Sequence, residues 1–231
     1  MFTAKFIKNI FLEAEGIRAI GRSGKLTRVF AKQGDLDGSC TIYSLMMMLI
    51  FHQFLDWEDL IDGERAKDSE FVGRIQHEFL HDLNGLCSDG YKLREISDRV
   101  NKCFGRKMCE AYTTEPDTQN TVSRGILQEM IKMYLDERIP ILLGYSKPSG
   151  PGHALVAVAY RKEAKNRLRL FCLDPSHGVP FMQLWNNVID LDYLTSDDDN
   201  FTDTNYWTEK KVCVNDFLVI DSFPAKTDCP F

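Results

Sequence analysis

The feature that most constrains the fold is an uncharged, mostly apolar run from Ile42 to Phe51. The run contains no glycine or proline, so nothing in it breaks a helix. A helix that is apolar on most sides must be enclosed by the rest of the molecule. We therefore predict a buried helix from Cys40 to about Leu55. The run is too short to cross a bilayer as a helix, which takes about 20 residues.

Cys40 stands at the first position of this predicted helix, directly after a polar, glycine-containing loop at 33–39. The first turn of a helix has unpaired N–H groups and a partial positive charge, and both lower the pKa of a thiol placed there. The thiolate is the nucleophilic form of cysteine. We expect Cys40 to be a nucleophile, against the alternative that it is one more small buried hydrophobe.

A histidine and an aspartate stand at matching ends of two predicted strands. His153 opens the strand at 154–160, and Asp174 follows the strand at 167–173. If these strands form an antiparallel hairpin, the start of the first lies beside the end of the second. The pattern therefore predicts that Asp174 orients His153 and that His153 is the base for Cys40.

Three other side chains bear on this site. His177 comes three residues after Asp174 and is the alternative base, whereas His52 lies on the predicted helix about three turns from Cys40 and cannot reach the thiol. Gln33 precedes Cys40 by seven positions. Its side-chain amide is a candidate to donate, with the backbone N–H of Cys40, to a developing oxyanion.

The remaining pattern predicts one α+β domain over residues 1–231. We expect a mainly helical lobe at 1–137 that carries Cys40, and an antiparallel β lobe at 138–231 that carries His153 and Asp174, with the active site in a cleft between them. Residues 2–20 are read as a short helix or strand. Further helices are predicted at about Glu64–Leu83, Leu93–Phe104 and Val122–Glu137, and further strands at Ile139–Gly144 and 212–220.

These motifs resemble the papain-like cysteine peptidase superfamily, in particular its compact bacterial members related to leader-peptide-processing peptidases. The matching pieces are Gln33 with Cys40 at a helix start, Gly152-His153-Ala154 at a strand start, and Leu173-Asp174-Pro175-Ser176 at a strand end. The resemblance covers the motifs and the helix-then-sheet layout, but not the helical region at 57–137. It implies Cys40 as nucleophile, His153 as base, Asp174 as orienting acid and Gln33 in the oxyanion hole.

A second motif favours different chemistry. The residues His77-Glu78-Phe79-Leu80-His81 match H-E-x-x-H, which on a helix binds zinc through two histidines and uses the glutamate as base. Asp82 adds a charge that zinc-peptidase helices usually lack, Asn84 replaces the glycine of the longer motif, and no third ligand is evident. Solvent-facing histidines on a surface helix are the simpler reading.

Charge and cysteine content narrow the partners and the compartment. A net charge of −6 and a pI near 5.4 argue against non-specific binding to nucleic acid or to an anionic membrane. We expect a protein or peptide substrate, no cofactor and no metal. Seven cysteines without a C-x-x-C pair predict neither a zinc ribbon nor a disulfide framework. Together with a start that lacks a signal-peptide pattern, they lead us to expect a cytoplasmic protein.

The sequence thus predicts a cysteine hydrolase, most simply a peptidase that works through an acyl-enzyme at Cys40. A transglutaminase, deamidase or acyltransferase uses the same triad and differs only in the acyl donor or in the acceptor. Two further alternatives stay open: a zinc peptidase built on His77, Glu78 and His81, and a non-catalytic interaction module with the same fold.

Overall fold

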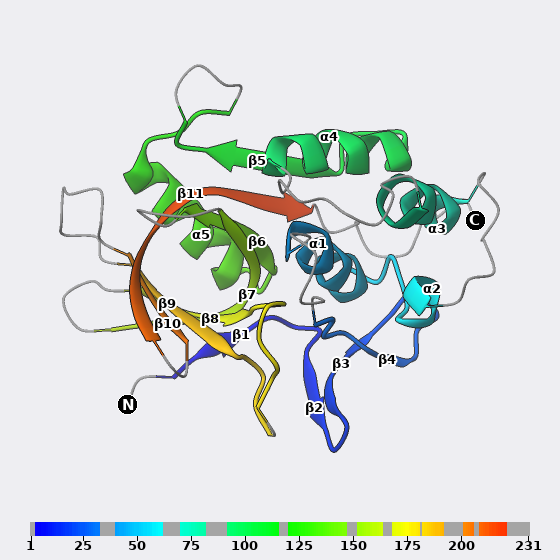
Figure 1. Cartoon of the computed structure of the whole chain (residues 1–231), viewed down its shortest axis with the longest axis horizontal. Coiled ribbons are helices and arrows are strands. Elements are labelled where there is room, and N and C mark those ends of the chain that lie inside the picture. Colours follow the sequence, from blue (N-terminus) through cyan, green and yellow to red (C-terminus); the bar gives the residue numbers. More distant parts are fainter. Residues whose placement is uncertain are drawn as a thin grey trace.

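The computed structural model combines helices with a large antiparallel sheet, so the protein is α+β (Figure 1). It describes residues 3–32, 40–61, 70–81, 92–115, 120–146, 152–163, 168–180, 182–191, 201–205 and 208–220. The helices are α1 (Cys40–Phe51), α2 (Glu58–Ile61), α3 (Phe71–Gln76), the π-helix η1 (His77–His81), α4 (Leu93–Phe104) and α5 (Arg124–Asp136). No helix in these ranges is long and apolar enough to cross a membrane.

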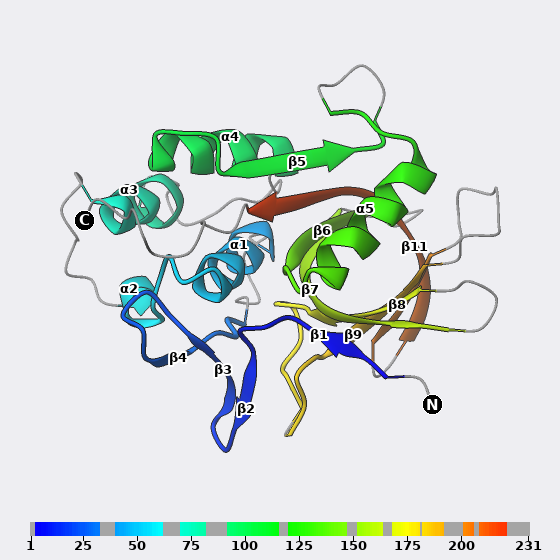
Figure 2. The same ribbon diagram turned by 180° about the vertical axis from the view of Figure 1, so that it is seen from behind.

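Six strands pair in a closed ring. They are β6 (Ile141–Ser146), β7 (His153–Lys162), β8 (Leu168–Leu173), β9 (Asn187–Leu191), β10 (Phe201–Asn205) and β11 (Thr208–Ile220). Each pairs antiparallel with the next, and β11 pairs back with β6. The ring curves around α5, as Figure 2 shows from behind. Apolar side chains of α5 and of the inward-facing strand positions fill it.

The remaining strands lie outside the ring. β1 (Lys5–Phe6) extends the sheet beside β7, and β5 (Cys109–Thr113) extends it beside β11. A separate three-stranded sheet is formed by β2 (Phe11–Glu13), β3 (Gly16–Ile20) and β4 (Leu26–Arg28). Two strands that precede residue 137 therefore belong to the same sheet as the C-terminal strands.

α1 packs against the outer face of the ring and is almost wholly enclosed. Eleven of its twelve residues are buried, as the apolar run predicts. Side chains alternate along β7: Ala154, Val156 and Val158 face the core around α1, while Leu155 and Ala157 face the core around α5. The first strand residues of β7 are thus held directly beneath the start of α1.

Several sequence predictions need correction at their ends. The buried helix stops at Phe51 rather than near Leu55, because Gln53 adopts a φ of 62° and the amides of Gln53 and Phe54 bond back to Ile50 and Leu49. Helices occupy Leu93–Phe104 and, two residues shorter at the start than predicted, Arg124–Asp136. Within the stretch predicted as Glu64–Leu83, the described part is α3 followed by η1.

Three strands lie where the sequence pattern predicted none. β5 interrupts the region expected to be mostly helical, and β9 and β10 fall in a stretch rich in aspartate and asparagine. β5 pairs with β11, β9 pairs with β8 and β10, and β10 pairs with β9 and β11. Tertiary pairing overrides local propensity here.

Candidate active site

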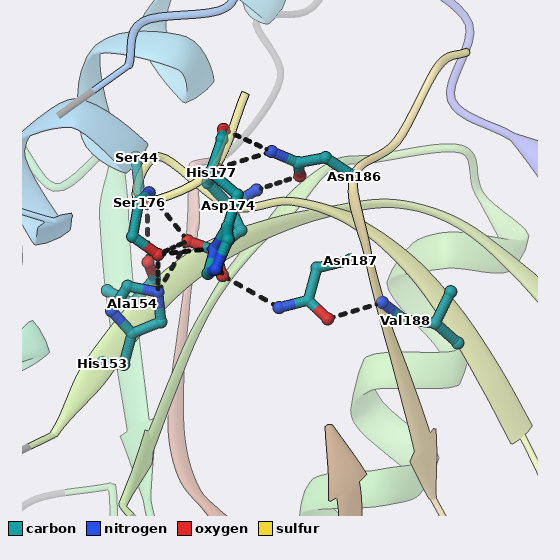
Figure 3. Close-up of polar contacts among 9 residues, drawn as sticks. All are labelled: Ser44, His153, Ala154, Asp174, Ser176, His177, Asn186, Asn187 and Val188. Atoms are coloured by element: carbon teal, nitrogen blue, oxygen red, sulfur yellow. Dashed lines mark hydrogen bonds and ion pairs between the residues drawn. The ribbon is translucent and has the colours of Figure 1, made fainter. Parts of the chain in front are cut away.

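Cys40 is the first residue of α1 and is 7% exposed. The helix is fixed over β7 by the Ser44 hydroxyl, which donates to the carbonyl oxygen of Ala154 at 3.2 Å (Figure 3). Burial opposes ionisation of the thiol, yet the pKa of Cys40 lies below its usual value. A hydrogen bond and charge attraction from His153, with smaller contributions from the Ala154 backbone and the Thr41 side chain, outweigh the burial.

His153 and Asp174 meet as the hairpin argument predicts. β7 and β8 pair antiparallel with Val156 opposite Leu173, so the start of one strand lies beside the end of the other. Nε2 of His153 lies 2.7 Å from Oδ1 of Asp174. The ring of Tyr145, directly across from His153 on β6, packs edge to face at a centroid distance of 5.4 Å.

The electrostatics of His153 follow from its two partners. Burial by itself lowers the pKa of an imidazole, but Asp174 and Cys40 together raise the pKa of His153 to about 10. Because Nε2 is bonded to Asp174, Nδ1 is the nitrogen that remains for the thiol. This arrangement favours a proton on the ring and a negative charge on the sulfur.

Asp174 is 1% exposed, and four side-chain or backbone groups besides His153 surround its carboxylate. Ser176 approaches Oδ1 with its amide at 2.9 Å and its hydroxyl at 2.5 Å, and Asn187 Nδ2 approaches Oδ2 at 2.9 Å. His177 Nδ1 lies 3.4 Å from Oδ2. Although burial raises the pKa of a carboxyl group, His153 above all, with His177 and Ser176, holds the pKa of Asp174 far below its usual range.

Two buried asparagines support this site, and sequence reasoning missed both. Asn186 bonds the backbone of Asp174 in both directions: its oxygen accepts from the amide at 2.6 Å and its Nδ2 donates to the carbonyl at 2.7 Å. Asn187 opens β9 and donates to the carboxylate itself (Figure 3). Adjacent asparagines ordinarily indicate a turn, so only the pairing of β9 with β8 reveals their role.

The other predicted residues lie in different places. His177 is half-exposed, shares Asp174 with His153 and is bonded to Ser176 Oγ at 3.0 Å. His52 follows the last turn of α1, at the end opposite Cys40, in agreement with the prediction that it cannot reach the thiol. Gln33 falls outside the described residues, so its place at the site stays a prediction.

The H-E-x-x-H residues form the π-helix η1 rather than an α-helix. His77 is exposed, and the Glu78 carboxylate lies 3.2 Å from Arg99 and 3.8 Å from Lys102 on α4. Among the described residues, no group of three or more histidine, cysteine, aspartate or glutamate side chains is placed to hold a metal ion. Glu78 therefore forms ion pairs that link η1 to α4.

Comparison with known proteins identifies no family for this chain. No family model matches the chain, and no curated protein matches it either. What the protein does must be inferred from the site itself.

Proposed function

We propose that the protein is a cysteine hydrolase with a papain-like arrangement, in which α1 and the strand ring flank an active-site cleft. Its most economical activity is cleavage of a protein or peptide through an acyl-enzyme at Cys40. The observation that carries the proposal is the chain of contacts from Cys40 to His153 to Asp174, with the pKa of the thiol lowered and that of the imidazole raised. A buried structural cysteine needs neither partner.

In the first half of the reaction, the Cys40 thiolate attacks the carbonyl carbon of the scissile amide. A carbon–sulfur bond forms, and the carbonyl electron pair moves onto oxygen. As the tetrahedral intermediate collapses, the carbon–nitrogen bond breaks and His153 gives its proton to the leaving amine. The product of this half is a thioester on Cys40 and a free amine.

In the second half, His153 takes a proton from water and the resulting hydroxide attacks the thioester. The carbon–sulfur bond breaks, the acid product leaves, and the proton on His153 restores the starting pair with Cys40. Asp174 keeps the ring oriented and stabilises its positive charge in both halves. Gln33 and the backbone amide of Cys40 are the proposed donors to the oxyanion, and loss of one such donor costs about 10²- to 10³-fold in kcat.

A comparison of Cys40 with Cys103 supports the assignment of Cys40 as the nucleophile. Burial and the charge of Glu78 raise the pKa of Cys103 to about 11, so this thiol is unreactive at neutral pH. Competitive labelling with iodoacetamide, read by mass spectrometry on the folded protein, tests the difference. We expect Cys40 to react first at pH 7, and labelling of Cys40 no faster than of Cys103 would refute the nucleophile.

Substrate cleavage provides the direct test. Proteome-wide mapping of new N-termini, with Cys40→Ala as the matched control, should give cuts only with the wild-type protein. Reaction in ¹⁸O-labelled water distinguishes hydrolysis, which places the label in the new carboxylate, from acyl transfer to an amine. Activity that EDTA removes and zinc restores, and that survives in Cys40→Ala, would instead assign the reaction to the H-E-x-x-H motif.

A further inference from the structure

A carboxylate with no hydrogen-bond partner among the described residues lies two strands away from the His153 strand, with β6 between them. Asp216 on β11 pairs with Gly144 on β6, and Gly144 pairs with Ala154 on β7, the residue after His153. Directly paired residues have Cβ atoms about 5 Å apart, so the three positions form one row across the sheet. Leu142 and Leu218, two residues from Gly144 and Asp216, face α1, so the row does too.

A bulge in β11 turns Asp216 toward this face. Val214 points into the apolar interior of the ring, and strict alternation would send Asp216 there as well. The register shifts between Val214 and Asp216, and the extra residue, Asn215, is held by bonds from Thr114 to its carbonyl at 2.7 and 3.1 Å. Asn215 also donates to Ser146 Oγ at 2.7 Å. Such bulges re-aim a side chain.

Gly144 on the neighbouring strand β6 leaves space for the Asp216 carboxylate because it has no side chain. A Cβ added at Gly144 would lie 1.8 Å from Oδ1 of Asp216, so any other residue there would displace the acid group. Among the described residues no group hydrogen-bonds to it. The charged groups that act on it are Lys92, the residue before α4, and Glu115, two residues after β5; they lie 3.8 Å from each other.

We propose that Asp216 binds a cationic side chain of the substrate, a lysine or an arginine, beside the carbonyl that Cys40 attacks. This inference rests on the proposed acyl transfer, because it places the cation in a peptide held at that thiol. The Ala154 backbone contacts the Cys40 sulfur, and Asp216 lies over the glycine paired with Ala154. A cation also offsets the cost of a half-buried carboxylate that no described residue hydrogen-bonds. The net charge of −6 attracts such substrates.

The binding should depend on pH. Burial and the charge of Glu115 raise the pKa of Asp216 to about 6, against a smaller opposing effect of Lys92. Below that pH the carboxyl group is neutral and loses its attraction for a cation, so preference for a cationic substrate should grow as the pH rises through about 6. Ionisation of Cys40 and His153 affects cationic and neutral substrates alike and cancels in the ratio of their rates.

The test uses two peptidyl acyloxymethyl ketones that differ at one residue, which is lysine in one and its neutral isostere norleucine in the other. A set of such pairs places this residue at each of the three positions before the ketone. At one position the wild-type protein should be labelled about ten- to a hundredfold faster by the lysine probe, the range expected for a charge-assisted hydrogen bond. In Asp216→Asn the ratio should fall to near one, with the norleucine rate unchanged. Glu115→Gln, which removes the neighbouring charge, should keep the preference.

A lysine preference that persists in Asp216→Asn, or that no position shows, would overturn the proposal. Failure of the norleucine probe to label Cys40 would instead count against the proposed function. In that case binding is measured without thiol chemistry, as fluorescence anisotropy of the lysine and norleucine peptide amides with Cys40→Ala. Tighter binding of the lysine peptide that is lost in Cys40→Ala/Asp216→Asn sustains the cation site, and equal binding of the two peptides rejects it.

Discussion

Two histidines at opposite ends of α1 show what a partner does to a buried imidazole. His153 lies beside Cys40 at the start of the helix, and its pKa rises to about 10. His52 follows the other end, stacks on Phe54 and has a buried Nε2 with no hydrogen-bond partner among the described residues. Burial lowers its pKa to about 4.

Burial lowers the pKa of both rings, so the difference comes from Asp174 and, after it, Cys40. The Asp174 carboxylate 2.7 Å away, with Cys40, more than offsets the loss of water around His153, while no described residue stabilises a positive charge on His52. The comparison separates a ring held charged at neutral pH from one held neutral. It also supports placing the proposed chemistry at the Cys40 end of the helix.

The largest expected effect is on turnover. Cys40→Ala and His153→Ala should each reduce the rate by about 10⁴-fold or more, and the double variant should lose little beyond either one, since the thiolate and its proton acceptor act as a unit. His52→Ala should keep the wild-type rate per folded molecule. His177→Ala should stay within a few-fold of it. Loss of turnover in His177→Ala, with turnover retained in His153→Ala, would show that His177 rather than His153 is the base for Cys40.

Asp174→Asn should make His153 behave more like His52. The amide keeps the shape but not the charge, so the pKa of His153 should fall and the fraction of Cys40 present as thiolate at pH 7 should fall with it. We expect about 10²- to 10³-fold slower turnover, with alkylation of Cys40 shifted to higher pH. Asp190→Asn, which breaks an ion pair with Arg169 on the same sheet, is the matched control. An unshifted alkylation profile in Asp174→Asn would contradict this account.

Asn187→Ala sharpens the comparison because it weakens the contact of Asp174 with His153 without removing the charge of Asp174. The carboxylate loses the donor at 2.9 Å and becomes freer to turn from His153. Turnover should drop by about tenfold, the value of one hydrogen bond to a charged group. The pH profile of Cys40 alkylation should move in the same direction as in Asp174→Asn, but by less. A stability loss with no change in that profile would make Asn187 purely structural.

The smallest effect concerns stability at the other end of α1. Replacement of His52 by phenylalanine removes an unpaired buried nitrogen and should stabilise the fold by about 1 kcal/mol at neutral pH. Because the folded-state pKa of His52 is depressed, its unfolded form binds the proton more tightly, and stability is lost as the pH falls from about 6.5 toward 4. Denaturant unfolding at pH 7 and pH 4.5 should show a smaller loss in His52→Phe than in wild type.

For His153 the sign is opposite. Its folded-state pKa is raised, so its contribution to stability is complete below about pH 6.5 and is lost as the pH rises toward 10. Cys40→Ala removes the coupled thiol, so denaturant unfolding between pH 7 and pH 10 should show a steeper loss in Cys40→Ala than in Cys40→Ala/His153→Ala. Equal slopes would contradict the charged state assigned to this ring.

Much of the site could be anticipated from local pattern. The apolar run predicts α1 and its burial, and the position of Cys40 before that run predicts a thiol at a helix start. Two β-prone segments with His153 and Asp174 at matching ends predict a hairpin, and the hairpin brings the two side chains together. These inferences succeed because helix burial and hairpin register depend on residues close together in the chain.

Other features depend on segments far apart in the chain. The sequence alone determines that α1 is buried, that Cys40 begins it and that Asp174 faces His153. Only the tertiary structure decides that Asn186 and Asn187 hold Asp174, that β1 and β5 join the large sheet, and that a bulge turns Asp216 toward α1. Strand pairing decides which groups a buried polar side chain contacts. Short-range periodicity does not predict which strands will be neighbours.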